Sequence, residues 1–255
     1  MTQDERLLSM QTWLLEQGKI TLTEVCERFY ISRDSARRDL IKVAQLPGIQ
    51  RVRGGAICVP VTANVEAYQQ KSITPAKLAI GRVAASLVDT NDYILLDTGT
   101  TLSAMASHLQ APLTVVTNSV DCLTTLSRDK HIGVHLLGGQ FNAFHRAILG
   151  TTAIQQLSAY RVNKAFIGVC ALSEHGLSTT SEAEASIKQA MIAQAAMVVL
   201  VCDSSKFGQQ HFFHICGLDK VDVIVTDQPP STSLKRIIAT HKIHLIVTEL
   251  SKENK

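Results

Sequence analysis

The chain has 255 residues, of which 45% are hydrophobic and 18% are charged, and its formal net charge at pH 7 is only +3. This hydrophobic content is ample for a buried core, and the length exceeds the usual size of one domain, so we expect two domains. A polar, charged N-terminus argues against a signal peptide, and the longest apolar stretch, around residues 195–202, is too short to cross a bilayer. We therefore expect a cytoplasmic protein without membrane contact.

The first predicted elements are two short helices. Residues 23–29 are expected to form one of them, with Thr23 as its N-cap. The second follows Ser32, a natural N-cap, and Asp34 in its first turn complements the helix dipole. Residues 30–31 alone separate the two helices, a spacing typical of a helix-turn-helix motif.

The second helix has an apolar face and a basic face. One side carries an i, i+4, i+7 stripe that can be buried, formed by Ala36, Leu40 and Val43. Arg38 is expected to point nearly opposite this stripe, with Arg37 on the flank. A small helix with guanidinium and hydroxyl groups on its outer face suits the major groove of DNA, where arginine can bond both phosphates and guanine edges.

A predicted β-hairpin follows the second helix. Pro47-Gly48 ends the helix, and the alternation of residues 51–53 runs into Gly54-Gly55, which is typical of a wing beside a helix-turn-helix. Between residues 28 and 53 the chain has seven basic and two acidic side chains, a local excess of five positive charges. A basic helix is often only a solvated face, but here the capped helix pair, the tight turn and the basic wing coincide, which favours DNA binding.

This region resembles the winged helix-turn-helix of the DeoR family of bacterial transcription regulators. The resemblance rests on the run Arg6, Leu7, Gly18, Ser32-x-x-Ser35-x-Arg37-Arg38-Asp39-Leu40, Arg51 and Gly54-Gly55-Ala56. Two positions depart from the family pattern: Ala36 replaces a β-branched residue, which loosens packing slightly, and Tyr30 occupies a turn position where a positive φ is awkward for its side chain. The expected DNA-contacting residues are Thr23, Ser32, Arg33, Ser35, Arg37, Arg38, Lys42, Arg51 and Arg53.

The domain organisation is expected to be a winged helix-turn-helix over residues 1–58, a linker over 59–75 and an effector-sensing domain over 76–250. Short apolar runs without alternation suit a parallel sheet covered on both faces. They lie at residues 93–96, 113–116, 134–137, 165–169, 197–201, 223–225 and 244–247. Helical segments between them, for example 101–109 and 182–196, indicate an open α/β domain with right-handed crossovers.

Polar residues at the strand ends point to a ligand site, because ligands of open α/β sheets bind at the carboxyl ends of strands. Asp97-Thr98-Gly99-Thr100-Thr101 joins a buried strand to a helix, and its backbone N–H groups and the helix dipole favour a phosphate. The ordinary alternative for each motif is structural: a threonine N-cap here, an i,i+4 surface ion pair for Glu184 and Lys188, and a turn for residues 203–208. Together they indicate an anionic, hydroxyl-rich ligand.

The same motifs, in the same order, resemble the C-terminal half of the DeoR family, a domain related in fold to sugar-phosphate isomerases. The resemblance implies an effector site for a phosphorylated sugar, lined by Asp97, Gly99, Thr100, Thr101, Asn118, Gly138, Gly139, Glu184, Lys188 and Lys206. In this hypothesis the Gly-Thr-Thr segment holds phosphate, the two lysines supply positive charge, and Asp97 and Glu184 accept hydrogen bonds from hydroxyls. The proximity of His145 and Arg146 to the ligand is left open.

Other chemistry finds little support in the sequence. The six cysteines are scattered and include no Cys-x-x-Cys pair, so we expect reduced thiols and no disulfide framework. Two histidine pairs, His211/His214 and His241/His244, lack a convincing third ligand, and we expect no metal, no cofactor and no catalytic residue.

Two functions remain. One is a transcriptional regulator, most simply a repressor of a carbohydrate-metabolism operon whose affinity for double-stranded operator DNA depends on a phosphorylated sugar. The other is a sugar-phosphate isomerase with a basic N-terminal appendage, for which Glu184 or Asp97 would be the base. An isomerase has no need of a winged helix-turn-helix, so we favour the regulator, acting as a homodimer or higher homo-oligomer on repeated half-sites.

Overall fold

The computed structural model describes residues 3–44, 49–52, 54–58, 73–110 and 112–248. The chain divides into two compact units, residues 1–65 and 66–255. Most of the expected linker, Arg53 of the expected wing and the Pro47-Gly48 pair lie outside the described residues. Within the described residues, no helix is long and apolar enough to span a membrane.

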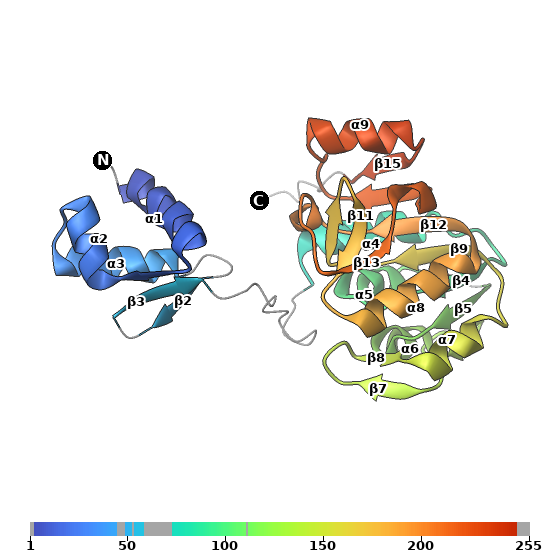
Figure 1. Ribbon diagram of the computed structural model, residues 1–255. Coiled ribbons are helices and arrows are strands. Elements are labelled where there is room, and N and C mark those ends of the chain that lie inside the picture. Colours follow the sequence, from blue (N-terminus) through green and yellow to red (C-terminus); the bar gives the residue numbers. More distant parts are fainter. Residues whose placement is uncertain (1–2, 45–48, 53, 59–72, 111, 249–255) are drawn as a thin grey trace, which may run out of the picture. The chain divides into compact units, whose positions relative to one another are not determined.

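In its described residues, the N-terminal unit has three helices and a small antiparallel sheet (Figure 1). Its elements, in chain order, are α1 (Gln3–Gln17), β1 (Lys19–Thr21), α2 (Leu22–Phe29), α3 (Arg33–Val43), β2 (Ile49–Val52) and β3 (Gly55–Cys58). The sheet has the strand order β1-β3-β2, and all its pairs are antiparallel. Both predicted helices and the predicted hairpin are therefore confirmed, whereas α1 and β1 were not anticipated from the sequence.

The core of this unit contains the apolar residues that helical periodicity predicted to be buried. Ala36, Leu40 and Val43 of α3 are all buried, and they pack in one cluster with Met10 and Leu14 of α1. Because the wing also contributes to this cluster, α3 is held on one face and presents the other to solvent.

The N-caps of the two helices bear out one prediction and overturn another. Ser32 caps α3, since its side chain accepts a hydrogen bond from the backbone N–H of Ser35 at 3.3 Å. The cap of α2 is Thr21 and not Thr23, because the helix begins at Leu22 directly after β1. Thr21 forms a capping box with Glu24: its Oγ1 accepts from the backbone N–H of Glu24, and its own backbone N–H donates to Oε2 of Glu24 at 2.7 Å.

Tyr30 ends α2 in the left-handed conformation that the sequence predicted. Its φ is 51° and its ψ is 45°, and its backbone N–H donates to the carbonyl oxygen of Cys26. The ring of Tyr30 is almost fully exposed, so its packing does not stabilise the turn.

The C-terminal unit is built on a seven-stranded sheet in which every neighbouring pair is parallel. Its strand order is β15-β14-β12-β9-β4-β5-β6 (Figure 1). In chain order these strands are β4 (Tyr93–Leu96), β5 (Leu113–Thr117), β6 (Ile132–Leu136), β9 (Val162–Ile167), β12 (Ala195–Val201), β14 (Val223–Thr226) and β15 (His244–Val247). All seven predicted strands are present, and β6 and β9 begin two and three residues earlier than expected.

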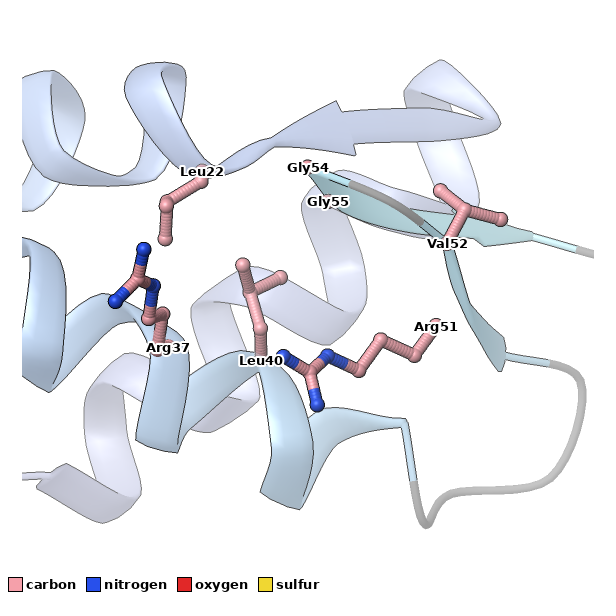
Figure 2. Close-up of a pocket in the computed structure, with 7 residues that line it drawn as sticks. All are labelled: Leu22, Arg37, Leu40, Arg51, Val52, Gly54 and Gly55. Atoms are coloured by element: carbon pink, nitrogen blue, oxygen red, sulfur yellow. The ribbon is translucent and has the colours of Figure 1, made fainter.

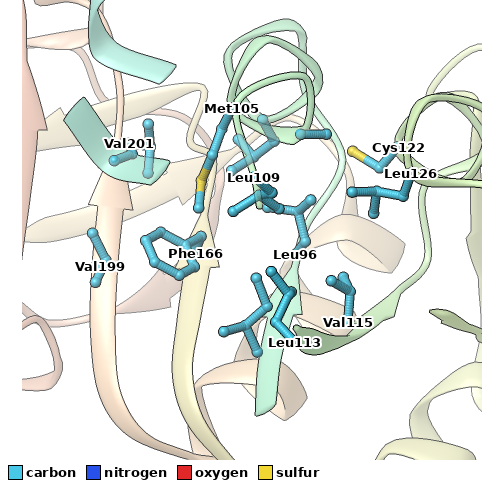
Figure 3. Close-up of a cluster of buried hydrophobic side chains, with 14 of the residues drawn as sticks. Leu96, Met105, Leu109, Leu113, Val115, Cys122, Leu126, Phe166, Val199 and Val201 are labelled. Carbon is cyan, nitrogen blue, oxygen red and sulfur yellow. The ribbon is translucent and has the colours of Figure 1, made fainter. Parts of the chain in front are cut away.

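Helices cover both faces of this sheet. Their bounds are α4 (Pro75–Ala85), α5 (Thr100–Ala106), α6 (Val120–Leu126), α7 (Thr151–Leu157), α8 (Glu182–Ala193) and α9 (Thr232–Thr240). On one face α4, α5 and α6 pack against Leu96 and Phe166, and Figure 3 shows Met105 of α5 beside these two side chains. On the other face α7 and α8 pack against the intervening residues, such as Leu95. This alternation along the strands confirms an open parallel-sheet α/β unit.

Short antiparallel elements that the sequence did not reveal complete the C-terminal unit. They are the hairpin of β7 (Gln140–Asn142) and β8 (Ala147–Leu149), and the three-stranded sheet of β10 (Ala171–Ser173), β11 (Gly176–Thr179) and β13 (Phe213–Cys216). The predicted helix over 182–196 is too long. It ends at Ala193, because residues 195–196 enter β12, where Ala195 pairs with Val162. Sheet pairing here overrides the helix preference of alanine.

Candidate functional sites

Helix α3 exposes a row of basic side chains. Arg33, Arg37, Arg38 and Lys42 are all exposed, whereas Ala36, Leu40 and Val43 of the same helix are buried. Arg38 Nε lies 3.4 Å from the backbone oxygen of Asp34, and Arg37 Nη1 lies 3.7 Å from the Asp34 carboxylate. Both contacts are local and solvent-exposed, so they leave the guanidinium groups accessible to a nucleic acid.

The remaining predicted residues of this unit lie around the row. Ser32 Oγ donates to Ser35 Oγ at 3.1 Å, and Lys42 Nζ donates to Oε1 of Gln3 on α1 at 2.8 Å. Thr23 is exposed on α2, and Arg51 is exposed on β2. The structure therefore gathers six of the predicted residues at α3 or its N-cap and one on the wing, with Thr23 on the neighbouring helix.

Asp39 is a structural residue, although sequence reasoning used it only as a negative charge and as part of the family motif. Its side chain is 1% exposed, and it accepts hydrogen bonds from Arg6 Nε and from Gln3 Nε2, each at 2.7 Å. These contacts hold α3 against α1. The available signal was its place one residue before Leu40, at the edge of the apolar stripe.

The hairpin is fixed to the helices at Gly54-Gly55. The backbone N–H of Leu22 donates to the carbonyl oxygen of Gly54 at 2.7 Å. A Cβ atom on Gly55 would lie only 2.1 Å from the carbonyl oxygen of Ile20, so a side chain at this position would push β3 away from β1. Between the hairpin and α3 lies an open pocket to which Arg37 and Arg51 both contribute (Figure 2).

In the C-terminal unit, polar residues follow two neighbouring strands at the same edge of the sheet. Asp97 follows β4 and Asn118 follows β5, whose residues Leu96 and Thr117 are paired. Both side chains are fully buried, and within the described residues Asp97 Oδ1 and Asn118 Oδ1 have no hydrogen-bond partner. Buried polar oxygens without hydrogen-bond partners are costly to a folded protein.

Lys188 is buried against Asp97, which overturns the interpretation of Glu184 and Lys188 as a surface pair. Lys188 Nζ donates to Asp97 Oδ2 and, at 3.0 Å, to the carbonyl oxygen of Gly168. Gly168 in turn donates its backbone N–H to Asp97 Oδ2 at 3.0 Å. Burial alone would lower the pKa of Lys188, but the carboxylates of Asp97 and Glu184 outweigh it and raise this pKa, so the ammonium group is charged.

Glu184 is also buried, and it joins the hairpin β7–β8 to α8. Its Oε2 accepts a hydrogen bond from Thr179 Oγ1 at 2.6 Å, and its Oε1 lies 3.4 Å from Nδ1 of His145. The backbone oxygen of His145 accepts from Thr98 Oγ1 at 3.2 Å, next to Asp97. His145 therefore belongs to this cluster. Thr179 was missed by sequence reasoning, and the polar run at residues 178–181 after Leu177 was the available signal.

The other predicted residues lie on three further segments of the C-terminal unit. Gly99 precedes α5 with a φ of 148°, a value that favours glycine, and Thr100 and Thr101 open the helix. Gly138 donates its backbone N–H to Gln156 Oε1 at 2.8 Å, and Gly139 leads into β7. Lys206 lies after β12 at the end of a short 3-10 turn, where its backbone N–H donates to the carbonyl oxygen of Asp203 at 3.1 Å, and within the described residues its ammonium group makes no hydrogen bond or ion pair.

Comparisons with solved structures find distant likenesses. The ribose 5-phosphate isomerase A of Methanocaldococcus jannaschii covers 53% of this chain and 55% of its own at a TM-score of 0.39 and 18% identity. The tetrameric eIF2B-beta2-delta2 complex of C. thermophilum covers 94% and 95% at a TM-score of 0.47 and 15% identity.

Comparisons of sequence find much nearer relatives. The transcriptional repressor GlcR of Bacillus subtilis is 38% identical over 252 residues, which cover 98% of both chains. The glycerol-3-phosphate regulon repressor of Escherichia coli is 28% identical over 96% of this chain and 99% of its own. The model of the DeoR-like helix-turn-helix domain matches residues 6–60, and that of the DeoR C-terminal sensor domain matches residues 73–228. With the capped α3, the wing and the parallel-sheet unit, these matches show that the chain belongs to the DeoR family of helix-turn-helix transcriptional regulators.

Proposed function

We propose that this protein is a sequence-specific DNA-binding repressor of a carbohydrate-related operon, and that a phosphorylated sugar controls its affinity for the operator. The observation that carries the DNA half is α3: one face is buried in the core, and the rest of its surface exposes four basic side chains. The relatives support the regulatory half, since they include GlcR, the glycerol-3-phosphate regulon repressor and the lactose phosphotransferase system repressor of Lactococcus lactis.

The effector site in this proposal is the sheet edge around Asp97 and Asn118. Their unpartnered oxygens are acceptors for sugar hydroxyls, and Gly99, Thr100 and Thr101 supply backbone donors and hydroxyls for the phosphate. Lys188 contributes positive charge from within its pair with Asp97. Lys206 is the weakest member of the predicted set, because it makes no polar contact with the cluster in the described part of the chain.

The isomerase alternative receives less support from the structure. An isomerase needs a carboxylate positioned as a base. Asp97 is paired with Lys188, and Glu184 accepts a hydrogen bond from Thr179, so both candidate carboxylates are engaged within the protein.

The effector would act by favouring one arrangement of two protomers on DNA over another. A single helix-turn-helix reads too few base pairs for a unique site, so we propose a homodimer or higher homo-oligomer bound to repeated half-sites. A near-complete switch between two arrangements needs a difference in effector affinity of about 10⁴-fold. Sedimentation of the protein on bound DNA tests the assembly, and a monomer on the DNA would contradict it.

The decisive experiment is fluorescence anisotropy on the DNA upstream of the protein's own gene, with a panel of sugar phosphates titrated in. We expect specific binding that one sugar phosphate abolishes. Thr100→Val should then bind DNA normally and respond only at higher effector concentration. Thr151→Val is a matched control, because Gly150-Thr151-Thr152 repeats the same tripeptide at the start of α7.

Each failure in this experiment has its own meaning. Binding that no sugar phosphate alters would remove the effector part of the proposal and leave the DNA part intact. A protein that binds no specific DNA would remove the DNA part, and an isomerase assay would then be the next measurement.

A further inference from the structure

The pocket between α3 and the hairpin has an apolar floor and two cationic walls. Leu22, Leu40 and Val52 form apolar parts of its lining, and Arg37 and Arg51 supply the charge. Figure 2 shows the two guanidinium groups turned into this space, one from the helix and one from the hairpin. No carboxylate lines the pocket among the described residues.

The two arginines are held by rigid parts of the unit and yet keep their hydrogen-bonding capacity. Leu40 between them is 3% exposed and belongs to the core, and the hairpin is tied to α2 through Gly54. In the described part of the chain the guanidinium group of Arg51 makes no hydrogen bond or ion pair, and Arg37 has one exposed ion pair, 3.7 Å from Asp34. Two guanidiniums carried by packed elements, with most of their donors unused, are suited to bind one anion between them.

The occupant follows from charge, shape and position. A phosphodiester carries one negative charge and two unesterified oxygens, which suit two guanidinium groups from opposite sides, and its deoxyribose is an apolar-edged ring that suits the floor formed by Leu40 and Val52. The pocket lies beside the exposed face of α3, where the DNA backbone must pass if this helix enters the major groove.

We propose that this pocket binds a single backbone phosphate of duplex DNA, clamped between Arg37 and Arg51. The inference rests on the proposed DNA binding, and it assigns different contacts to different basic residues. Arg37 and Arg51 set the register of the protein on the backbone and carry no sequence information, whereas Arg33 and Arg38, which do not line the pocket, are left to face base edges.

The test measures affinity and its salt dependence for the full-length protein on two duplexes, one with the upstream sequence of its own gene and one of random sequence. Arg37→Gln and Arg51→Gln should each weaken binding about tenfold, by the same factor on both duplexes. The double variant should lower the slope of log K against log salt by about 0.9 per bound protomer, the value for one phosphate.

Other results would overturn the clamp. A slope reduced by about 1.8 per bound protomer in the double variant would mean two separate phosphates, and a loss confined to the upstream duplex would mean base reading. Wild-type affinity in both single variants would leave the pocket without a role. If the wild-type protein bound neither duplex, the proposed DNA binding itself would fail, and the clamp with it.

Two controls complete the design. Arg236→Gln, on the exposed side of α9 in the other unit, should leave affinity and slope unchanged. Because Arg37 and Arg51 are exposed, their substitution should leave the thermal unfolding of the N-terminal unit unchanged, as followed by the fluorescence of Trp13.

Discussion

Arg6 donates its Nε hydrogen to Asp39 Oδ2 at 2.7 Å, and this contact joins two helices whose paired residues stand 33 positions apart in the chain. The Asp39 carboxylate is nearly inaccessible to solvent, and Arg6 is 13% exposed. The aspartate of the Arg-Arg-Asp-Leu run therefore orients the recognition helix and does not face DNA.

Removing Arg6 should destabilise the N-terminal unit strongly. Arg6→Ala leaves a buried carboxylate with Gln3 as its remaining side-chain partner among the described residues, and breaking such a pair costs about 3 kcal/mol of unfolding free energy. Chemical denaturation followed by Trp13, the single tryptophan of the chain, measures this loss, because its ring packs against Phe29 and Arg28 in this unit. Arg33→Ala, at an exposed position of α3, is the control and should stay within about 0.5 kcal/mol.

The corrected N-cap of α2 gives a second prediction. Thr21→Ala should cost about 1 kcal/mol of unfolding free energy, because it removes an oxygen that satisfies a helix-terminal N–H group. Thr23→Ala should change it by less than about 0.5 kcal/mol, since Thr23 is exposed inside the helix. Equal effects of the two substitutions, again from Trp13 fluorescence, would contradict the assignment of Thr21.

The capping box also predicts a pH dependence. Hydrogen bonds from the side chain and backbone of Thr21 lower the pKa of Glu24 below its usual value of 4.5. A carboxyl group with a depressed native pKa contributes stability that is complete above the unfolded value and is lost as pH falls through the native one. The difference in stability between wild type and Glu24→Gln should therefore be constant above pH 4.5 and shrink below it. If the stability difference between wild type and Glu24→Gln grew as the pH fell, the native pKa of Glu24 would be raised and not lowered, which would contradict the prediction.

Arg38 is predicted to read bases. Arg38→Ala should reduce affinity for the upstream DNA by about 1–3 kcal/mol and reduce discrimination against random sequence, as expected for a bidentate guanine contact. Anisotropy at several salt concentrations separates the alternatives. An equal loss on all sequences, together with a smaller salt slope, would make Arg38 a phosphate contact.

The buried pair of Lys188 and Asp97 predicts a strong and non-additive effect on stability. Lys188→Met alone should cost about 3–5 kcal/mol of unfolding free energy in the C-terminal unit, because it leaves Asp97 buried without its cation. Asp97→Asn combined with Lys188→Met should cost less than the sum of the two single changes. Circular dichroism during denaturation measures both, and Lys235→Met on the exposed face of α9 is the control. Additive losses would show that the pair is not coupled.

Much of the fold was predictable because its signals are local. The apolar stripe of α3, its cap at Ser32 and the left-handed Tyr30 depend on neighbouring residues, and the structure confirms all three. The seven strands were also visible, since strands buried on both faces are continuously apolar. The short hairpins were missed because they are three or four residues long and contain no periodicity that a window can detect.

The sequence by itself determined which residues form the basic face of α3 and which polar residues follow the strands. Helical periodicity and the ends of apolar runs depend only on residues that are close together in the chain. Only the tertiary structure decided what those residues contact. It pairs Lys188 with Asp97, which is 91 positions away in the chain, and Arg6 with Asp39. It also brings Arg37 and Arg51 to the lining of one pocket. The physical reason is that burial and ion pairing depend on which segments meet in space, and chain packing alone brings such distant residues together.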